Sequence, residues 1–147
     1  MTATAHALIG TVIAAKVQNP YLAVPLALAS HFVADLIPHW DIATNKRKKS
    51  KGRMFNEALI DVLFGFFISY FLIFFLFPAT NLLYAFWVIV VAQLPDWLFA
   101  PYYFFGIKQM KWAYTLGKAT NTDLDLPWGI VGQAIIVLLL ILSAVLL

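Results

Sequence analysis

Cysteine is absent from this chain of 147 residues. Its absence excludes a disulfide framework and a metal site built from thiolates, and it leaves the redox state of the compartment undetermined. Charge is also scarce, since Asp, Glu, Lys and Arg make up 12% of the residues, against about a quarter in soluble domains. Hydrophobic residues account for 63%, and the mean hydropathy is +0.84. A soluble fold of this length has too little interior for so much apolar surface, so the composition predicts an all-α integral membrane protein.

Proline and short polar turns divide the chain into five apolar segments. They cover residues 3–18, 21–37, 54–77, 82–94 and 127–147. A helix that crosses a bilayer needs about 20 apolar residues, so the first and fourth segments are short for a span. The start of the chain lacks a basic region and an obvious cleavage site, which favours a retained membrane helix over a signal peptide. We therefore expect about five membrane helices.

The same prolines and polar turns predict one membrane domain over residues 1–147. We expect it to be built, in order, from a helical hairpin over 3–41, a basic loop over 45–53, a second hairpin over 54–106, a polar loop over 107–126 and a C-terminal helix over 127–147. Pro38 and Pro95 should end the second and fourth segments, because proline cannot continue the backbone hydrogen bonding of a helix. The aromatic stretch 96–106 is expected at the lipid–water interface, which Trp and Tyr favour.

The basic residues predict the orientation. Nine of the ten lie in two loops that fall on the same side if every segment spans, namely Lys46, Arg47, Lys48, Lys49, Lys51, Arg53, Lys108, Lys111 and Lys118. Lys and Arg in short loops mark the cytoplasmic face, so the N-terminus is expected in the cytoplasm. A net charge of +3 held mainly in one short loop does not indicate nucleic-acid binding, and membrane lipid is the expected partner.

Ionisable side chains gather at one depth on this topology. All three histidines and five of the seven acids fall in the cytoplasmic half, at His6, His31, Asp35, His39, Asp41, Glu57, Asp61 and Asp96. Charged groups are costly inside a bilayer and usually face the bundle interior or a water-filled cavity. Two members also have local explanations: Glu57 suits the first turn of a helix, and Asp96 is placed like the N-cap of an interfacial helix.

The motif HFVADLIPHWD, residues 31–41, holds the densest part of this layer. His31 and Asp35 are four residues apart and so share a helix face, which is a workable spacing for metal ligands. Imidazole with carboxylate suits a divalent ion such as zinc or manganese. Two other interpretations remain open: a His–carboxylate hydrogen bond that fixes helix packing, and a proton relay.

A short internal repeat extends the motif. LIPHWD, residues 36–41, is similar to QLPDWL, residues 93–98, and each closes an apolar segment. The match predicts two similar hairpins in the same orientation. It would place His39 and Asp96 on opposite sides of one site.

These features resemble a family of small prokaryotic multipass membrane proteins described as membrane-bound metal-dependent hydrolases. The likeness runs roughly from residue 4 to 106, with a weaker match at PWGIVGQ, residues 127–133. His31, Asp35, His39 and Asp41 fit the family's H-x3-D-x2-P-H/D-x-D pattern, and His6, Asp61 and Asp96 fit its scattered His and Asp positions. The more hydrolase-like relatives carry a later histidine-rich motif, whereas this chain has no histidine after His39. The resemblance implies a location in the prokaryotic cytoplasmic (inner) membrane.

The leading hypothesis is a metal-dependent hydrolase of a lipid-linked or phosphoester substrate at the cytoplasmic face. Asp41 and Asp61 are then further ligands or the general base, and the expected metal ligands are His6, His31, Asp35, His39 and Asp96. The main alternative is a non-enzymatic scaffold or interaction protein whose buried His–Asp network locks the helices together. A third hypothesis, an ion or proton transporter, requires polar groups that continue across the membrane.

Overall fold

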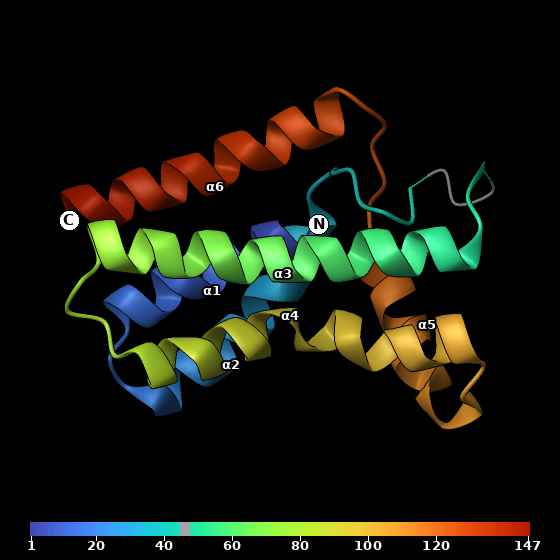
Figure 1. The fold of residues 1–147 in the computed structure, drawn as a ribbon, viewed down its shortest axis with the longest axis horizontal. Coiled ribbons are helices and arrows are strands. Elements are labelled where there is room, and N and C mark those ends of the chain that lie inside the picture. The colour runs from blue at the N-terminus through green and yellow to red at the C-terminus, as the bar shows by residue number, and fades with distance from the viewer. Residues whose placement is uncertain (45–47) are drawn as a thin grey trace.

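The computed structural model describes residues 1–44 and 48–147, and these residues form six α-helices and no strand. The helices are α1 (Ala3–Lys16), α2 (Pro20–Leu36), α3 (Lys51–Leu76), α4 (Leu82–Phe105), α5 (Lys111–Thr120) and α6 (Trp128–Leu146), with a short 3-10 helix, η2 (Lys108–Met110), before α5 (Figure 1). The all-α prediction is confirmed. Lys46 and Arg47 of the predicted basic loop lie outside the described residues.

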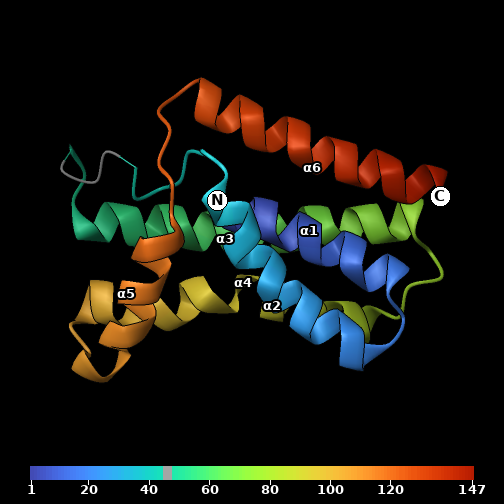
Figure 2. The same ribbon diagram turned by 180° about the vertical axis from the view of Figure 1, so that it is seen from behind.

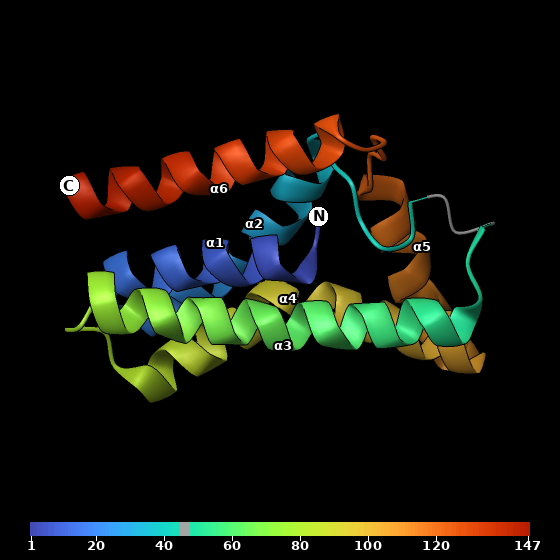
Figure 3. The same ribbon diagram turned by 45° about the horizontal axis from the view of Figure 1, so that its top comes forward.

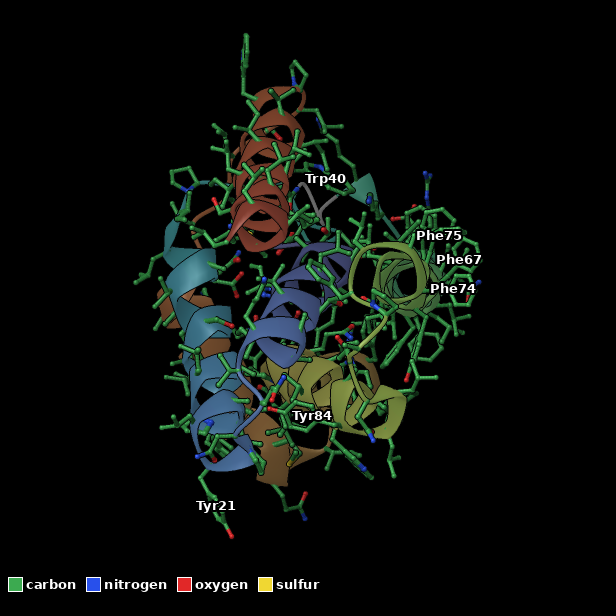
Figure 4. All side chains as sticks on the ribbon, turned by 90° about the vertical axis from the view of Figure 1, so that its left-hand side faces the viewer. Tyr21, Trp40, Phe67, Phe74, Phe75 and Tyr84 are labelled. Atoms are coloured by element: carbon green, nitrogen blue, oxygen red, sulfur yellow. The ribbon has the colours of Figure 1, made fainter. Side chains whose placement is uncertain are left out.

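Three helices, α3, α4 and α6, are long and apolar enough to cross a membrane. Helices α1 and α2 are apolar but shorter, at 14 and 17 residues. Large side chains on α3 point away from the other helices (Figure 4), and Phe67, Phe74 and Phe75 are 65%, 74% and 61% exposed. An apolar surface of this kind suits contact with lipid rather than water. The membrane character is therefore supported, with three helices of spanning length where the sequence predicts about five.

Helix α1 lies at the centre of the bundle and contacts α2, α3, α4 and α6 (Figures 1 and 2). Two glycines allow close approaches between α1 and its neighbours. A Cβ added at Gly10 would lie 2.9 Å from the Cβ of Ala92 on α4, and one added at Gly65 would lie 3.0 Å from the Cα of Thr4. Small residues at such contacts let helix backbones approach closely, which is how helices gain van der Waals contact in lipid.

Helix α4 continues through both of its prolines, so the prediction that it ends before Pro95 is wrong. The helix runs to Phe105 with Pro95 and Pro101 inside it, and its ribbon changes direction near the middle (Figure 3). Proline removes one backbone hydrogen bond, and a membrane helix tolerates this loss with a local bend. Asp96 is consequently an interior residue of α4 and not the N-cap of a separate helix. The helix ends at Gly106, whose φ of 71° favours glycine.

Residues 107–126, predicted as a polar loop, contain η2 and α5. Ala113 of α5 is buried, and the ring of Tyr114 packs against Phe99 and Tyr102 of α4. The chain then runs beside the end of α2, where the backbone of residues 122–124 exchanges hydrogen bonds with that of residues 35–39. We call residues 122–124 the strap. The sequence prediction missed α5 because the helix is short and polar residues interrupt its apolar ones.

The two hairpins run in the same direction, as the internal repeat predicts. Helices α1 and α3 point one way along the bundle, and α2 and α4 return (Figures 1 and 3). The start of α3, the end of α4 and all of α5 lie at one end of the molecule, whereas the end of α1, with Lys16, lies at the other (Figure 1). The described lysines and arginines of the two basic loops therefore gather at one end, which we call the basic end.

Glu57 has a different role from the predicted helix cap. Its carboxylate accepts hydrogen bonds from Lys49 Nζ at 2.6 Å and from Arg53 Nε at 2.7 Å. The cap of α3 is Ser50, whose side chain accepts from the backbone of Arg53. Glu57 thus belongs to an ion-pair cluster at the basic end of α3.

Candidate metal centre

The five predicted metal ligands come together where the start of α1, the end of α2 and the middle of α4 meet. His6 lies in the first turns of α1, His31 and Asp35 in the last turns of α2, His39 just beyond α2 and Asp96 in α4. All three histidines are 1% exposed or less and Asp35 is 4% exposed, whereas the side chain of Asp96 is 30% exposed. The cluster is therefore closed on the α1–α2 side and accessible along α4.

Asp35 is the hub of this cluster. Its Oδ1 lies 3.1 Å from Nε2 of His6 and 3.7 Å from Nε2 of His39, and its Oδ2 lies 3.3 Å from Nε2 of His31. The amino group of Met1 also pairs with Oδ1. A buried carboxylate is costly unless cations or hydrogen-bond donors surround it. All three imidazoles direct Nε2 toward this carboxylate. They compensate its charge if each Nε2 carries a proton or if the rings share a bound cation.

Backbone carbonyls fix the tautomers of two histidines. His31 Nδ1 lies 2.8 Å from the carbonyl oxygen of Ala92, and His39 Nδ1 lies 2.7 Å from that of Ile37. Because a carbonyl oxygen can only accept, both Nδ1 atoms donate, and a neutral ring then presents a lone pair at Nε2. Metal-binding histidines are usually oriented by this type of outer hydrogen bond.

His31 Nε2 faces two carboxylate oxygens, Oδ2 of Asp35 and Oδ1 of Asp96, the second at 3.6 Å. Acceptors facing one another repel unless a proton or a cation lies between them. The nitrogens His39 Nε2 and His6 Nδ1 are buried without a hydrogen-bond partner in the described structure, and buried polar atoms of this kind need an explanation. A proton on Nε2 or a bound cation would explain the orientation at His31, and a cation would also explain the unpaired nitrogen of His39.

His6, His31 and Asp96 form the group best placed to hold a metal ion. Each offers one ligand atom, and these atoms all lie within 4.8 Å of one another. Two ligands of one tetrahedral zinc lie about 3.3 Å apart, given bonds of about 2.0 Å. A small inward movement would therefore be enough for all three to bind. Imidazole nitrogens with carboxylate oxygens suit zinc, and a higher oxygen content suits manganese.

The two predicted catalytic acids lie beside this group and already accept hydrogen bonds. Asp61 holds the start of α1, accepting from Ala3 N at 2.7 Å and from Thr4 Oγ1 at 2.6 Å. Asp41 accepts from the backbone of Thr44 at 2.6 Å and from its hydroxyl at 3.0 Å. Thr2 is the N-cap of α1, and Asp61 has a clear structural function because it satisfies two further backbone N–H groups of the first turn from the neighbouring helix α3. A role for either acid as ligand or general base stays a prediction.

A cavity of about 500 Å³ adjoins the cluster at the basic end. Asp35, Asp41, Asp61 and Asp96 all reach it. The remaining wall is largely apolar and aromatic, with contributions from Phe55, Leu59, Trp97, Tyr103, Phe104, Phe105 and Tyr114. Phe105 and Leu59 are 67% and 50% exposed on the outside of the bundle. A volume of this size and character is typical of sites for small organic ligands.

Sequence reasoning missed the backbone groups that position the proposed ligands. The Ala92 carbonyl orients His31 but has no signature in the sequence, because any residue has a carbonyl. The strap holds His39 from both sides, since His39 N donates to Thr122 O at 3.0 Å and His39 O accepts from Leu124 N at 2.7 Å. Gln133 of α6 donates to the carbonyl of Trp40 at 2.9 Å, which ties α6 to the same turn. Of these residues, only Gln133 carries a signal, as a lone amide in an apolar helix.

Comparisons of the chain with protein-family models, with curated proteins and with solved structures find no match. The geometry of the His–Asp cluster and its cavity is therefore the basis for a proposed function.

Proposed function

We propose that the chain is a metal-dependent membrane hydrolase that acts on a lipid-linked or phosphoester substrate. The observation that carries this proposal is the convergence of three histidine Nε2 atoms and two aspartates beside a largely apolar cavity. The proposed ligands are His6, His31 and Asp96, and Asp35 lies beside both of these histidines and beside His39. We propose zinc or manganese as the ion, from the mixture of imidazole and carboxylate.

The proposed chemistry follows from two parts of the cavity, the aspartates that border the cluster and the aromatic wall. A divalent ion polarises a phosphoester oxygen and lowers the pKa of a bound water, which supplies hydroxide near neutral pH. His6, His31 and Asp96 would hold and orient the ion, and Asp96 is partly exposed where it lines the cavity. The aromatic wall would accommodate the apolar part of a lipid-linked substrate.

The proposed location is the cytoplasmic face of a prokaryotic inner membrane. The described part of the chain gathers its loop lysines and arginines at the end of the bundle where the cavity lies. The positive-inside rule assigns such an end to the cytoplasm. On this orientation, water and soluble products enter and leave from the cytoplasmic side.

Metal content tests the proposal directly. The protein is purified in detergent, and bound metal is measured for the wild type and for His31→Ala and Asp35→Asn. Glu57→Gln, which removes a charge at the basic end away from the cluster, is the matched control. We expect close to one ion per chain in the wild type and in Glu57→Gln, and a marked loss in the two site variants. Equal metal in all four proteins would contradict the proposal.

Activity is tested with the same four proteins in detergent micelles that contain a lipid phosphomonoester. We expect release of phosphate that a chelator stops and that zinc or manganese restores. Release that is unaffected by chelator in the wild type and in His31→Ala would contradict the metal-dependent mechanism.

A specific observation favours a second candidate, a non-enzymatic scaffold. Asp35 connects α1, α2, the turn after α2 and the Met1 amino group within one buried network, and removing one partner of such a network is costly. On this hypothesis Asp35→Asn lowers the melting temperature, and added metal changes neither protein. Stability retained together with loss of bound metal would instead exclude the scaffold role.

A further inference from the structure

Helix α5 has two different faces. Its inner face packs on α4 through the buried Ala113, the ring of Tyr114 and Gly117, where an added Cβ would lie 3.7 Å from Phe99. Its outer face carries Trp112 and Leu116, which are 59% and 46% exposed. The described residues thus leave two large apolar side chains of α5 uncovered.

The uncovered side chains form a stripe. Trp112, Leu116 and Ala119 are spaced by four and three residues, which places them on one side of the helix. Together with Lys111 and Thr115 they surround a shallow apolar depression on the surface. An amphipathic helix with Trp and Leu on one face and lysines beside them has the composition of helices that lie in a bilayer interface.

The charged side chains around α5, over residues 97–122, are all positive. Lys108, Lys111 and Lys118 lie on η2 and α5, and no Asp or Glu occurs between Asp96 and Asp123. The nearby start of α3 adds Lys51 and Arg53 at the same end of the molecule. A cluster of lysines and arginines next to membrane-spanning helices attracts anionic lipid headgroups.

The direction of α5 fits a membrane surface. Helix α3 is the longest helix of the described residues and α6 the most apolar of the three spanning candidates, and their axes run roughly along the same line (Figure 1). Helix α5 runs across that line (Figures 1 and 2). If α3 and α6 cross a bilayer, α5 lies close to the plane of the membrane, at the basic end. The apolar stripe can then enter the acyl boundary while the lysines stay at headgroup level.

We propose that α5 is an in-plane helix that binds the anionic headgroup layer of the bilayer through its Trp112–Leu116 stripe and its neighbouring lysines. The inner face of the same helix contributes Tyr114, Gly117 and Lys118 to the cavity wall. Binding to the membrane surface therefore holds one wall of the cavity at headgroup depth. The proposal does not depend on metal binding or on hydrolysis.

Spin labelling tests the position of α5 in the full-length chain. Because the chain has no cysteine, single variants Trp112→Cys, Leu116→Cys, Leu138→Cys and Lys51→Cys each take one nitroxide. The labelled proteins are reconstituted into phosphatidylcholine vesicles that contain phosphatidylglycerol. The accessibility of each label to oxygen and to a water-soluble nickel chelate is then compared, since oxygen concentrates in lipid and the chelate in water.

We expect the labels at 112 and 116 to favour oxygen over the chelate, at a depth between the Leu138 label on α6 and the Lys51 label. Labels at 112 and 116 that are as accessible to the chelate as the one at 51 would overturn the proposal. Labels shielded from both reagents would overturn it as well, because protein and not lipid would then cover the stripe.

A second arm tests the anionic lipid. In the Leu116→Cys protein we expect the label to move to a shallower and more mobile position when phosphatidylglycerol is omitted. Lys108→Gln and Lys111→Gln introduced together should remove that dependence on lipid composition. Lack of any response to phosphatidylglycerol while both lysines are present would overturn headgroup binding.

Discussion

The imidazole rings of His6 and His31 stack on one another, with centroids 3.9 Å apart and planes at 20°. Two protonated imidazoles would repel each other at this separation, so the arrangement favours at least one neutral ring. Neutral imidazole is also the form that binds a metal. The stacking therefore connects helix packing between α1 and α2 with the state that the proposed site requires.

Metal retention should depend on pH, because protons compete with the ion for histidine nitrogens. We expect bound zinc to be held at neutral pH and released as the pH falls below about 6.5, the ordinary titration range of imidazole. Equilibrium dialysis against zinc over a series of pH values measures this. His31→Ala serves as the reference, since it should bind little zinc at any pH. A wild-type protein that keeps its zinc unchanged down to a pH of about 4, well below that range, would contradict the histidine assignment.

Replacing Gly65 by Ala should destabilise the bundle. The added Cβ would lie 3.0 Å from Thr4 Cα and 3.1 Å from Ala7 Cβ, and helix backbone cannot yield as a flexible side chain can. Overpacking of this kind costs about 1–3 kcal/mol. Thermal unfolding in detergent provides the measurement. Gly132→Ala, which meets nothing within 4 Å, is the matched control and should be neutral or slightly stabilising.

Substitution of Asp61 separates its two roles. Both carboxylate oxygens of Asp61 accept hydrogen bonds from α1, and Asn keeps only one accepting oxygen, so Asp61→Asn should lower the melting temperature less than Asp61→Ala, which loses about 1–3 kcal/mol of stability. An amide cannot accept a proton as a general base, so hydrolysis should fall in both variants if Asp61 is the base. Full hydrolytic activity in Asp61→Asn would leave Asp61 with its structural role alone.

Filling the cavity should block a lipid substrate without disturbing the metal. Ala100 lines the cavity, and Ala100→Trp introduces bulk there, while Ala119→Trp places the same side chain on the outer surface of α5. We expect hydrolysis of a lipid phosphomonoester to fall by about tenfold or more in Ala100→Trp, because small displacements of a bound substrate are costly. Metal content should stay at the wild-type level in both proteins. Equal activity of the two variants would argue that the substrate binds elsewhere.

Proline shows how far the sequence could predict the fold. Helix α2 ends at Leu36, just before Pro38, whereas α4 continues through Pro95. After Pro38 the chain is polar, and the strap satisfies the backbone of His39 with two hydrogen bonds. After Pro95 the chain is again apolar, and Pro95 itself is buried in the bundle. Whether the helix stops or continues at each proline depends on contacts with other parts of the fold, and the local sequence does not reveal those contacts.

The candidate site was more predictable than the fold around it. The free-energy cost of burying His6, His31 and Asp35 in an apolar chain is a property of the residues themselves, and it predicts that they contact one another. Their orientation could not be predicted, because it depends on the Ala92 carbonyl. The contact of Asp61 with the first turn of α1 likewise depends on where α1 sits beside α3.

The strap also sets the order in which the site can be completed during synthesis. His6, His31 and Asp35 leave the ribosome early, but His39 is held in place by the backbone of Thr122 and Leu124. These residues are made only after α3, α4 and α5. His39 therefore gains these two backbone hydrogen bonds only after the strap has been synthesised, later than its neighbours in the cluster.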